Sequence, residues 1–65
     1  MNTAYEWEEE IHRKYTPVPG KRYWHYKNKH GTYFQSFLGP KNWSNYECLG
    51  LWAMTLKGQW LQVNP

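Results

Sequence analysis

Residues 51–63, LWAMTLKGQWLQV, decide between two folds for this chain. A two-residue turn at Lys57–Gly58 would make this stretch a β-hairpin with regular alternation of its side chains. One face would then carry Trp52, Met54, Leu56, Leu61 and Val63, and the other would carry Ala53, Thr55, Trp60 and Gln62. We favour the hairpin because it explains both of its strands together.

A helical interpretation of the same region stays open. Ser44 and Glu47 have the spacing of a capping box, and Gly58 suits the residue that follows a helix end. A helical stripe would be formed by Cys48, Leu49, Trp52, Ala53 and Leu56. In this alternative the chain is a helix, a β-hairpin and a second helix at about residues 45–57.

The N-terminal segment predicts a helix over roughly residues 4–15. Thr3 and Glu6 have capping-box spacing, and Pro17 ends the pattern. Apolar residues recur three and four positions apart at Ala4, Trp7, Ile11 and Tyr15. Acids precede bases by four positions in the pairs Glu8–His12, Glu9–Arg13 and Glu10–Lys14. We expect Trp7 and Ile11 to pack on a sheet.

Residues 22–38 predict a β-hairpin. RYWHYK and TYFQSFL are rich in β-favouring residues, and Asn28–Gly31 supplies turn chemistry between them. With that loop, Lys27 faces Thr32, and Tyr23, His25, Lys27, Phe34 and Ser36 share one face. The expected fold is therefore α+β, a single domain over residues 1–65 with an N-terminal amphipathic helix on an antiparallel sheet of three to four strands.

Composition points to binding at a surface. The 65 residues include five Trp, six Tyr and two Phe, more than one small core holds. The net charge of +3 is uneven, since residues 1–10 carry four acids and no base, whereas residues 11–65 carry all eight bases and only Glu47. A positive surface of this kind attracts an anionic partner. The single cysteine favours a reducing, cytoplasmic location, and no apolar run is long enough to span a membrane.

Catalytic and metal sites are not indicated by the sequence. The chain has no Asp, and four of its five acids lie beside bases on the predicted helix, so paired carboxylates for acid–base chemistry are not expected. His25, His30 and Cys48 lack the close ligand spacing of a zinc site. We therefore expect no enzyme activity, no metal and no cofactor.

The first functional hypothesis is binding of single-stranded nucleic acid. Basic residues hold phosphates, and aromatic rings on a sheet surface stack on bases. The expected stacking residues are Tyr23, His25 and Phe34, and the expected phosphate contacts are Lys21, Arg22, Lys27, Lys29 and Lys41.

The alternative hypothesis is a regulator or inhibitor that binds a protein partner. Trp43 lies in the loop sequence GPKNWSNY and is not claimed by any core pattern, so it could anchor an interface. If the last third were a helix, Leu51 and Met54 would form an exposed apolar patch beside it. A small basic protein of this kind would suit a phage or mobile-element gene.

Overall fold

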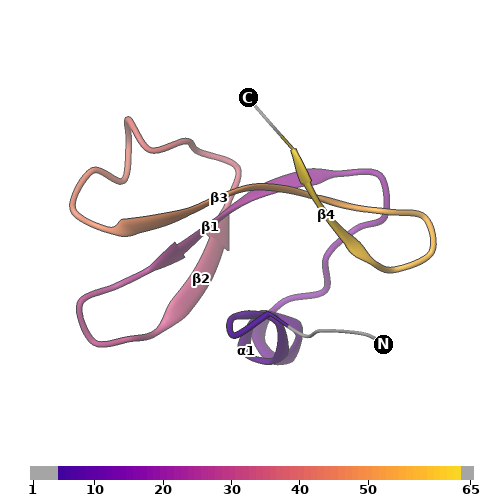
Figure 1. Ribbon diagram of the computed structural model, residues 1–65, viewed down its shortest axis with the longest axis horizontal. Coiled ribbons are helices and arrows are strands. Elements are labelled where there is room, and N and C mark those ends of the chain that lie inside the picture. Colours follow the sequence, from indigo (N-terminus) through magenta and orange to yellow (C-terminus); the bar gives the residue numbers. More distant parts are fainter. Residues whose placement is uncertain (1–4, 64–65) are drawn as a thin grey trace.

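The computed structural model describes residues 5–63, which form one helix and one antiparallel sheet. The elements in chain order are α1 (Glu8–Lys14), β1 (Arg22–Lys27), β2 (Tyr33–Ser36), β3 (Glu47–Met54) and β4 (Trp60–Val63). The strands are ordered β2-β1-β3-β4, and the helix lies along one side of the sheet (Figure 1). The predicted α+β fold is confirmed, and residues 51–63 form a hairpin, not a second helix.

The helix begins later than predicted because residues 5–7 form a turn that packs on the core. The Tyr5 ring stacks on Trp7 at a centroid distance of 5.1 Å and meets Trp52 edge-on at 4.6 Å. The Glu8 carboxylate accepts a hydrogen bond from the Tyr5 N–H at 3.3 Å, which holds this turn against the start of the helix. Thr3 and Ala4, which the prediction placed at the helix start, lie outside the described residues.

The inner face of the sheet, the face that α1 covers, holds the main core. Its buried apolar side chains are Trp7, Ile11, Tyr23, Trp52, Met54 and Trp60. The indole N–H of Trp60 donates to Nε2 of His12 at 2.9 Å, which ties the helix to β4. The expectation that Trp7 and Ile11 pack on the sheet is confirmed.

The β1–β2 register differs by one residue from the prediction. Lys27 pairs with Tyr33 instead of Thr32, and Tyr26 pairs with Phe34. The reason is the turn, in which the Asn28 side chain accepts two backbone hydrogen bonds and makes the loop one residue longer than expected. Because side chains alternate, a shift of one residue moves Phe34 to the face opposite Lys27.

The β3–β4 turn also differs by one residue. Thr55 and Gln59 close it through a backbone hydrogen bond of 2.8 Å, and Met54 pairs with Trp60. The Thr55 hydroxyl accepts a further hydrogen bond from the Gln59 N–H at 3.0 Å, which favours this turn. The prediction that Leu61 shares a face with Met54 is therefore wrong, because Trp60 takes that place on the inner face.

A β-bulge interrupts the pairing of β1 with β3. His25 pairs with Gly50 and Tyr26 pairs with Cys48, which leaves Leu49 as the extra residue. Gly50 has a φ of 107°, a conformation that L side chains rarely adopt. Either side of the bulge, His25 and Tyr26 are both fully buried, although they point to opposite faces of the sheet.

Candidate nucleic-acid interface

Two of the three predicted stacking residues are in the core. Tyr23 is 5% exposed and His25 is 0% exposed. Both project from β1 onto the inner face, where Phe37 stacks on Tyr23 at 5.0 Å and Trp7 lies 4.1 Å from His25. The Tyr23 hydroxyl accepts a hydrogen bond from the Val18 N–H at 2.9 Å. The prediction that these rings lie on an open surface is therefore wrong.

The third predicted stacking residue, Phe34, belongs to an aromatic group on the opposite, outer face. This outer aromatic cluster consists of Tyr26, Phe34, Trp43 and Tyr46. Phe34 lies 5.3 Å from Tyr26, 5.1 Å from Trp43 and 5.3 Å from Tyr46 between ring centroids. The cluster joins β1 and β2 to the loop over residues 37–46, most of which lies on the side of the sheet away from α1 (Figure 1). Phe37, at the start of the loop, instead stacks on Tyr23 of the inner face at 5.0 Å.

Two hydrogen bonds hold this loop on the outer face. The Tyr26 hydroxyl donates to the Leu38 carbonyl at 2.7 Å, and the Trp43 indole N–H donates to the Ser36 hydroxyl at 3.1 Å. Burial raises the pKa of Tyr26, and the nearby Cys48 thiol raises it further, so the phenol stays protonated and able to donate. The loop is thus a fixed part of the outer surface.

The residues expected to anchor a protein partner are not the free side chains that the prediction required. Trp43 is half-buried in the outer aromatic cluster, because its ring packs on Phe34. Met54 is 3% exposed, because residues 45–57 are not helical and its strand turns it to the inner face. Leu51 is half-buried and lies on the outer face, in register with Trp24.

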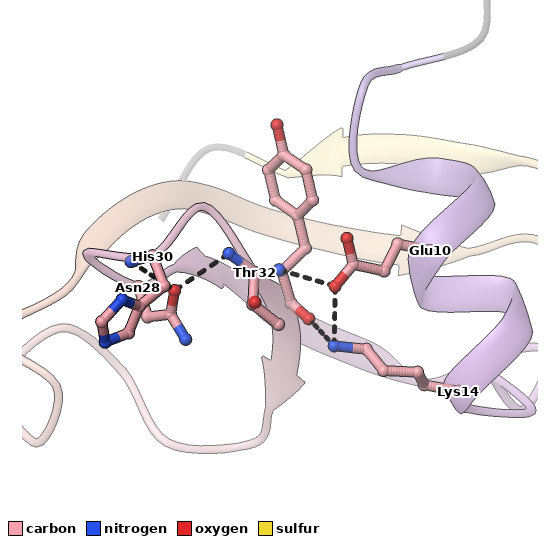
Figure 2. Close-up of polar contacts among 6 residues, drawn as sticks. Glu10, Lys14, Asn28, His30 and Thr32 are labelled. Carbon is pink, nitrogen blue, oxygen red and sulfur yellow. Dashed lines mark hydrogen bonds and ion pairs between the residues drawn. The ribbon is translucent and has the colours of Figure 1, made fainter.

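A cleft of about 340 Å³ lies between the β1–β2 turn and the end of the loop. Its lining residues are Asn28, Lys29, His30, Asn45 and Tyr46. Figure 2 shows how the turn side is held: Asn28 Oδ1 accepts hydrogen bonds from the backbone N–H groups of His30 and Thr32, both at 2.9 Å. Because the Asn28 oxygen serves the turn, its amide N–H groups remain as the donors of this side chain.

The loop side of the cleft is formed by Tyr46, whose ring is 39% exposed. Edge contacts at 5.3 Å with both Phe34 and Trp43 fix the orientation of this ring. Asn45 and Tyr46 were not among the predicted site residues. The composition of the loop gave no signal that residues 45–46 would lie beside residues 28–30. The two segments are separated in the sequence by β2 and by most of the loop.

The predicted phosphate contacts are divided between the two ends of the sheet. Lys29 lines the cleft, and Lys41 is exposed in the loop that leads to it. Lys21 and Arg22 are exposed at the other end of β1. Lys27 lies with its ammonium group 5.6 Å from the centre of the Tyr33 ring.

The chain resembles no protein in the three comparisons made: no family model, no curated protein and no solved structure matches it. Among residues 5–63, no group of three or more metal-ligating side chains is gathered at one place. The only helix in the same residues, α1, is too short and too polar to cross a bilayer.

Proposed function

We propose that this protein binds single-stranded nucleic acid at the cleft between the β1–β2 turn and the loop, without catalysing a reaction. The observation that supports the proposal is the lining of the cleft. Lys29 and His30 stand on one side and the partly exposed ring of Tyr46 stands on the other. These groups complement the two parts of a nucleotide, its phosphate and its flat base.

Each lining group has a defined role in this proposal. Lys29 contacts a backbone phosphate, and the Tyr46 ring stacks on a base. The amides of Asn28 and Asn45 hydrogen-bond to polar groups on the edge of that base. Phe34, which the sequence analysis expected to stack on a base itself, instead supports the Tyr46 ring through an edge contact.

The preference for a single strand follows from the size of the cleft. About 340 Å³ is at the lower end of the range of roughly 300–1,000 Å³ that is typical of ligand pockets. A site of this size admits one unpaired base, whereas the bases of a duplex are stacked and hidden from Tyr46. The excess of bases over acids in residues 11–65 adds a general attraction for phosphate.

The test is a titration of intrinsic Trp fluorescence with a short oligothymidine at low and moderate salt. We expect binding that weakens steeply with salt, and we expect Lys29→Gln to lower the slope of log affinity against log salt by about one. Tyr46→Ala removes the stacking ring, worth about 1–3 kcal/mol per base, and weakens binding by roughly 5- to 150-fold.

Lys57→Gln is the matched control for Lys29→Gln. Lys57 is also exposed, but it lies in the β3–β4 turn, away from the cleft. Loss of affinity on Lys29→Gln alone supports the cleft. Equal losses on both substitutions would show only diffuse charge attraction, and no binding at low salt would exclude the proposed function.

A further inference from the structure

The helix closes one edge of the sheet. At the β2 edge, the Tyr33 N–H donates to Oε2 of Glu10 at 3.0 Å, and the Lys14 ammonium group donates to the Tyr33 carbonyl. Lys14 also pairs with Glu10 at 2.9 Å, so the three residues form one network (Figure 2). The backbone of Tyr33, which would otherwise offer a donor and an acceptor to another strand, is occupied by side chains of α1.

The opposite edge of the sheet, at β4, is not closed in this way. Within residues 5–63, no further strand pairs with β4 beyond β3. The pair Thr55 and Gln59 is hydrogen-bonded, and bonded pairs alternate with non-bonded pairs in an antiparallel ladder. The backbone N–H and C=O groups of Trp60 and Gln62 therefore point to the open edge.

β4 is short, at four residues, but it lacks other features that protect an edge strand. Its sequence WLQV contains no charged residue and no Pro, and its ladder with β3 runs without a bulge. Leu61, on the outer face, is 61% exposed. Nothing in the sequence of β4 itself prevents another strand from pairing with it.

Apolar side chains continue from β4 across the outer face. One row runs Trp24, Leu51 and Val63, and the next holds Ala53 and Leu61, with the base Arg22 at its far end on β1. The loop over residues 37–46 covers the other end of this face, where Tyr26 and Phe34 lie. The two rows form an apolar strip that leads to the open edge of β4.

Basic residues surround this end of the sheet. The Met54 N–H donates to the Lys21 carbonyl at 3.0 Å, so Lys21 and Arg22 lie beside the β3–β4 turn that carries Lys57. Two acids of the N-terminal segment, Glu6 and Glu10, instead hydrogen-bond to Tyr33 on β2. The end of the sheet that holds the β3–β4 turn, where β4 begins, is therefore basic and complements an acidic partner.

We propose that the β4 edge binds an extended, acidic and apolar peptide segment of a partner protein, which adds to the sheet as a fifth strand. The segment forms main-chain hydrogen bonds with Trp60 and Gln62 and places apolar side chains beside Leu61 and Val63. Its acids face Lys57 and the other bases at this end. A second copy of the chain has no acid in its own β4 and carries the same Lys57 in the turn before it, so it does not supply these acids.

The probe for this proposal is a short fluorescent peptide of alternating valine and threonine with glutamates at both ends. Its binding is measured by fluorescence anisotropy, beside the same peptide with lysines in place of the glutamates. We expect the acidic peptide to bind at least tenfold more tightly than the basic one. Lys57→Gln should weaken binding of the acidic peptide, whereas Lys29→Gln, at the other end of the sheet, should leave it unchanged.

The main-chain hydrogen bonds are tested by Gln62→Pro with Gln62→Ala as its control. The Gln62 N–H points outward, so proline removes a donor for the partner without breaking the ladder to β3. Both variants lose the glutamine side chain, and only Gln62→Pro loses the N–H. We expect Gln62→Pro to bind the peptide about tenfold more weakly than Gln62→Ala.

Thermal melts followed by circular dichroism show whether each variant is folded. Leu61→Lys gives a second test of peptide binding, at an exposed side chain of β4. Leu61→Lys places a charge beside the apolar side chains of the peptide and should weaken its binding. Equal binding by Gln62→Pro and Gln62→Ala would overturn the proposal. So would failure of the wild type to bind the acidic peptide, or sedimentation of the wild type as a dimer that the peptide does not dissociate.

Discussion

The two faces of the sheet both carry aromatic clusters, but the clusters are covered in different ways. On the inner face, Trp7, just before α1, lies 4.9 Å from Trp52 and 5.4 Å from Trp60, and Ile11 of α1 belongs to the same buried cluster. On the outer face, Tyr26 is fully buried, whereas Tyr46 of the same cluster keeps 39% of its surface exposed. A helix supplies a complete cover, and a ten-residue loop supplies a partial one.

Because of this difference, we expect the inner cluster to contribute mainly to stability and the outer cluster mainly to binding. The inner cluster joins residues that are far apart in sequence, and its rings meet in the edge-on geometry that adds to their burial. The outer cluster fixes the loop but leaves Tyr46, which lines the cleft, 39% exposed. We therefore expect substitutions in the inner cluster to unfold the protein, and substitutions in the outer cluster to alter the candidate site in a folded protein.

The largest expected effect is that of Trp7→Ala. Trp7 is buried among Trp52, Trp60 and His25, so truncation leaves a cavity and costs about 3–5 kcal/mol. A domain of this size has a total stability of only about 3–10 kcal/mol, so the variant should be largely unfolded. Urea unfolding followed by circular dichroism measures the loss.

Trp43→Ala is the matching substitution on the outer face. It removes a half-buried ring and the hydrogen bond to Ser36, and should cost about 1–2 kcal/mol. The protein should remain folded, with a less ordered loop. A larger loss of stability for Trp43→Ala than for Trp7→Ala would contradict the division between the two faces.

The next prediction concerns the effect of low pH on a histidine of the inner face. His25 is fully buried and packs 4.1 Å from Trp7 and 4.5 Å from Trp60, and neither of its ring nitrogens has a hydrogen-bond partner within residues 5–63. Burial lowers the pKa of His25 to about 4; the Gln35 amide opposite opposes this shift, and His12 adds to it. The imidazole is therefore neutral in the folded protein at pH 7.

The sign of the pH dependence follows from these values. Between pH 6.5 and about 4, the unfolded chain binds a proton at His25 that the folded chain does not bind. The free energy of unfolding is therefore not reduced by His25 above pH 6.5. It falls by about 3 kcal/mol as the pH is lowered from 6.5 to 4. Urea unfolding at a series of pH values measures this loss.

His25→Leu is the control for the acid effect. Leucine is similar in size, does not titrate and has no buried nitrogen without a partner. Glu10, whose pKa is lowered by its hydrogen bond from Lys14, contributes acid sensitivity equally to both proteins. If His25→Leu loses as much stability on acidification as the wild type, His25 is not the group responsible.

The sequence predicted the fold better than the faces. The residue types and turn signals were sufficient for the helix, the strands and the burial of Trp7 and Ile11. Which face a strand residue occupies depends, however, on whether the turn before it has an odd or an even number of residues. Both turns are one residue longer than predicted. The side chains of Asn28 and Thr55 stabilise these longer turns through hydrogen bonds that spacing alone does not reveal.

The prediction of the candidate site depended on the same turn lengths. Phe34 lies on the outer face, whereas Tyr23 and His25, which were predicted to share a face with it, lie buried on the inner face. Lys29 was found from local composition because it lies in a turn. Tyr46 was not, because its contact with Phe34 joins β2 to a loop whose path the sequence does not specify.

An effect as small as that of Trp43→Ala is expected for Gly50→Ala, which tests the bulge in the pairing of β1 with β3. At φ 107° an alanine is strained, and its Cβ would lie 2.9 Å from Nε2 of Gln62, so the substitution should cost about 1–2 kcal/mol. The Gln62 side chain is flexible and can move, so most of this cost is expected to come from the backbone. Urea unfolding of Gly50→Ala with and without Gln62→Ala separates the two causes. Recovery of less than half of the loss in the double variant would support the backbone origin, whereas full recovery would show that Gly50 is required only for space beside Gln62.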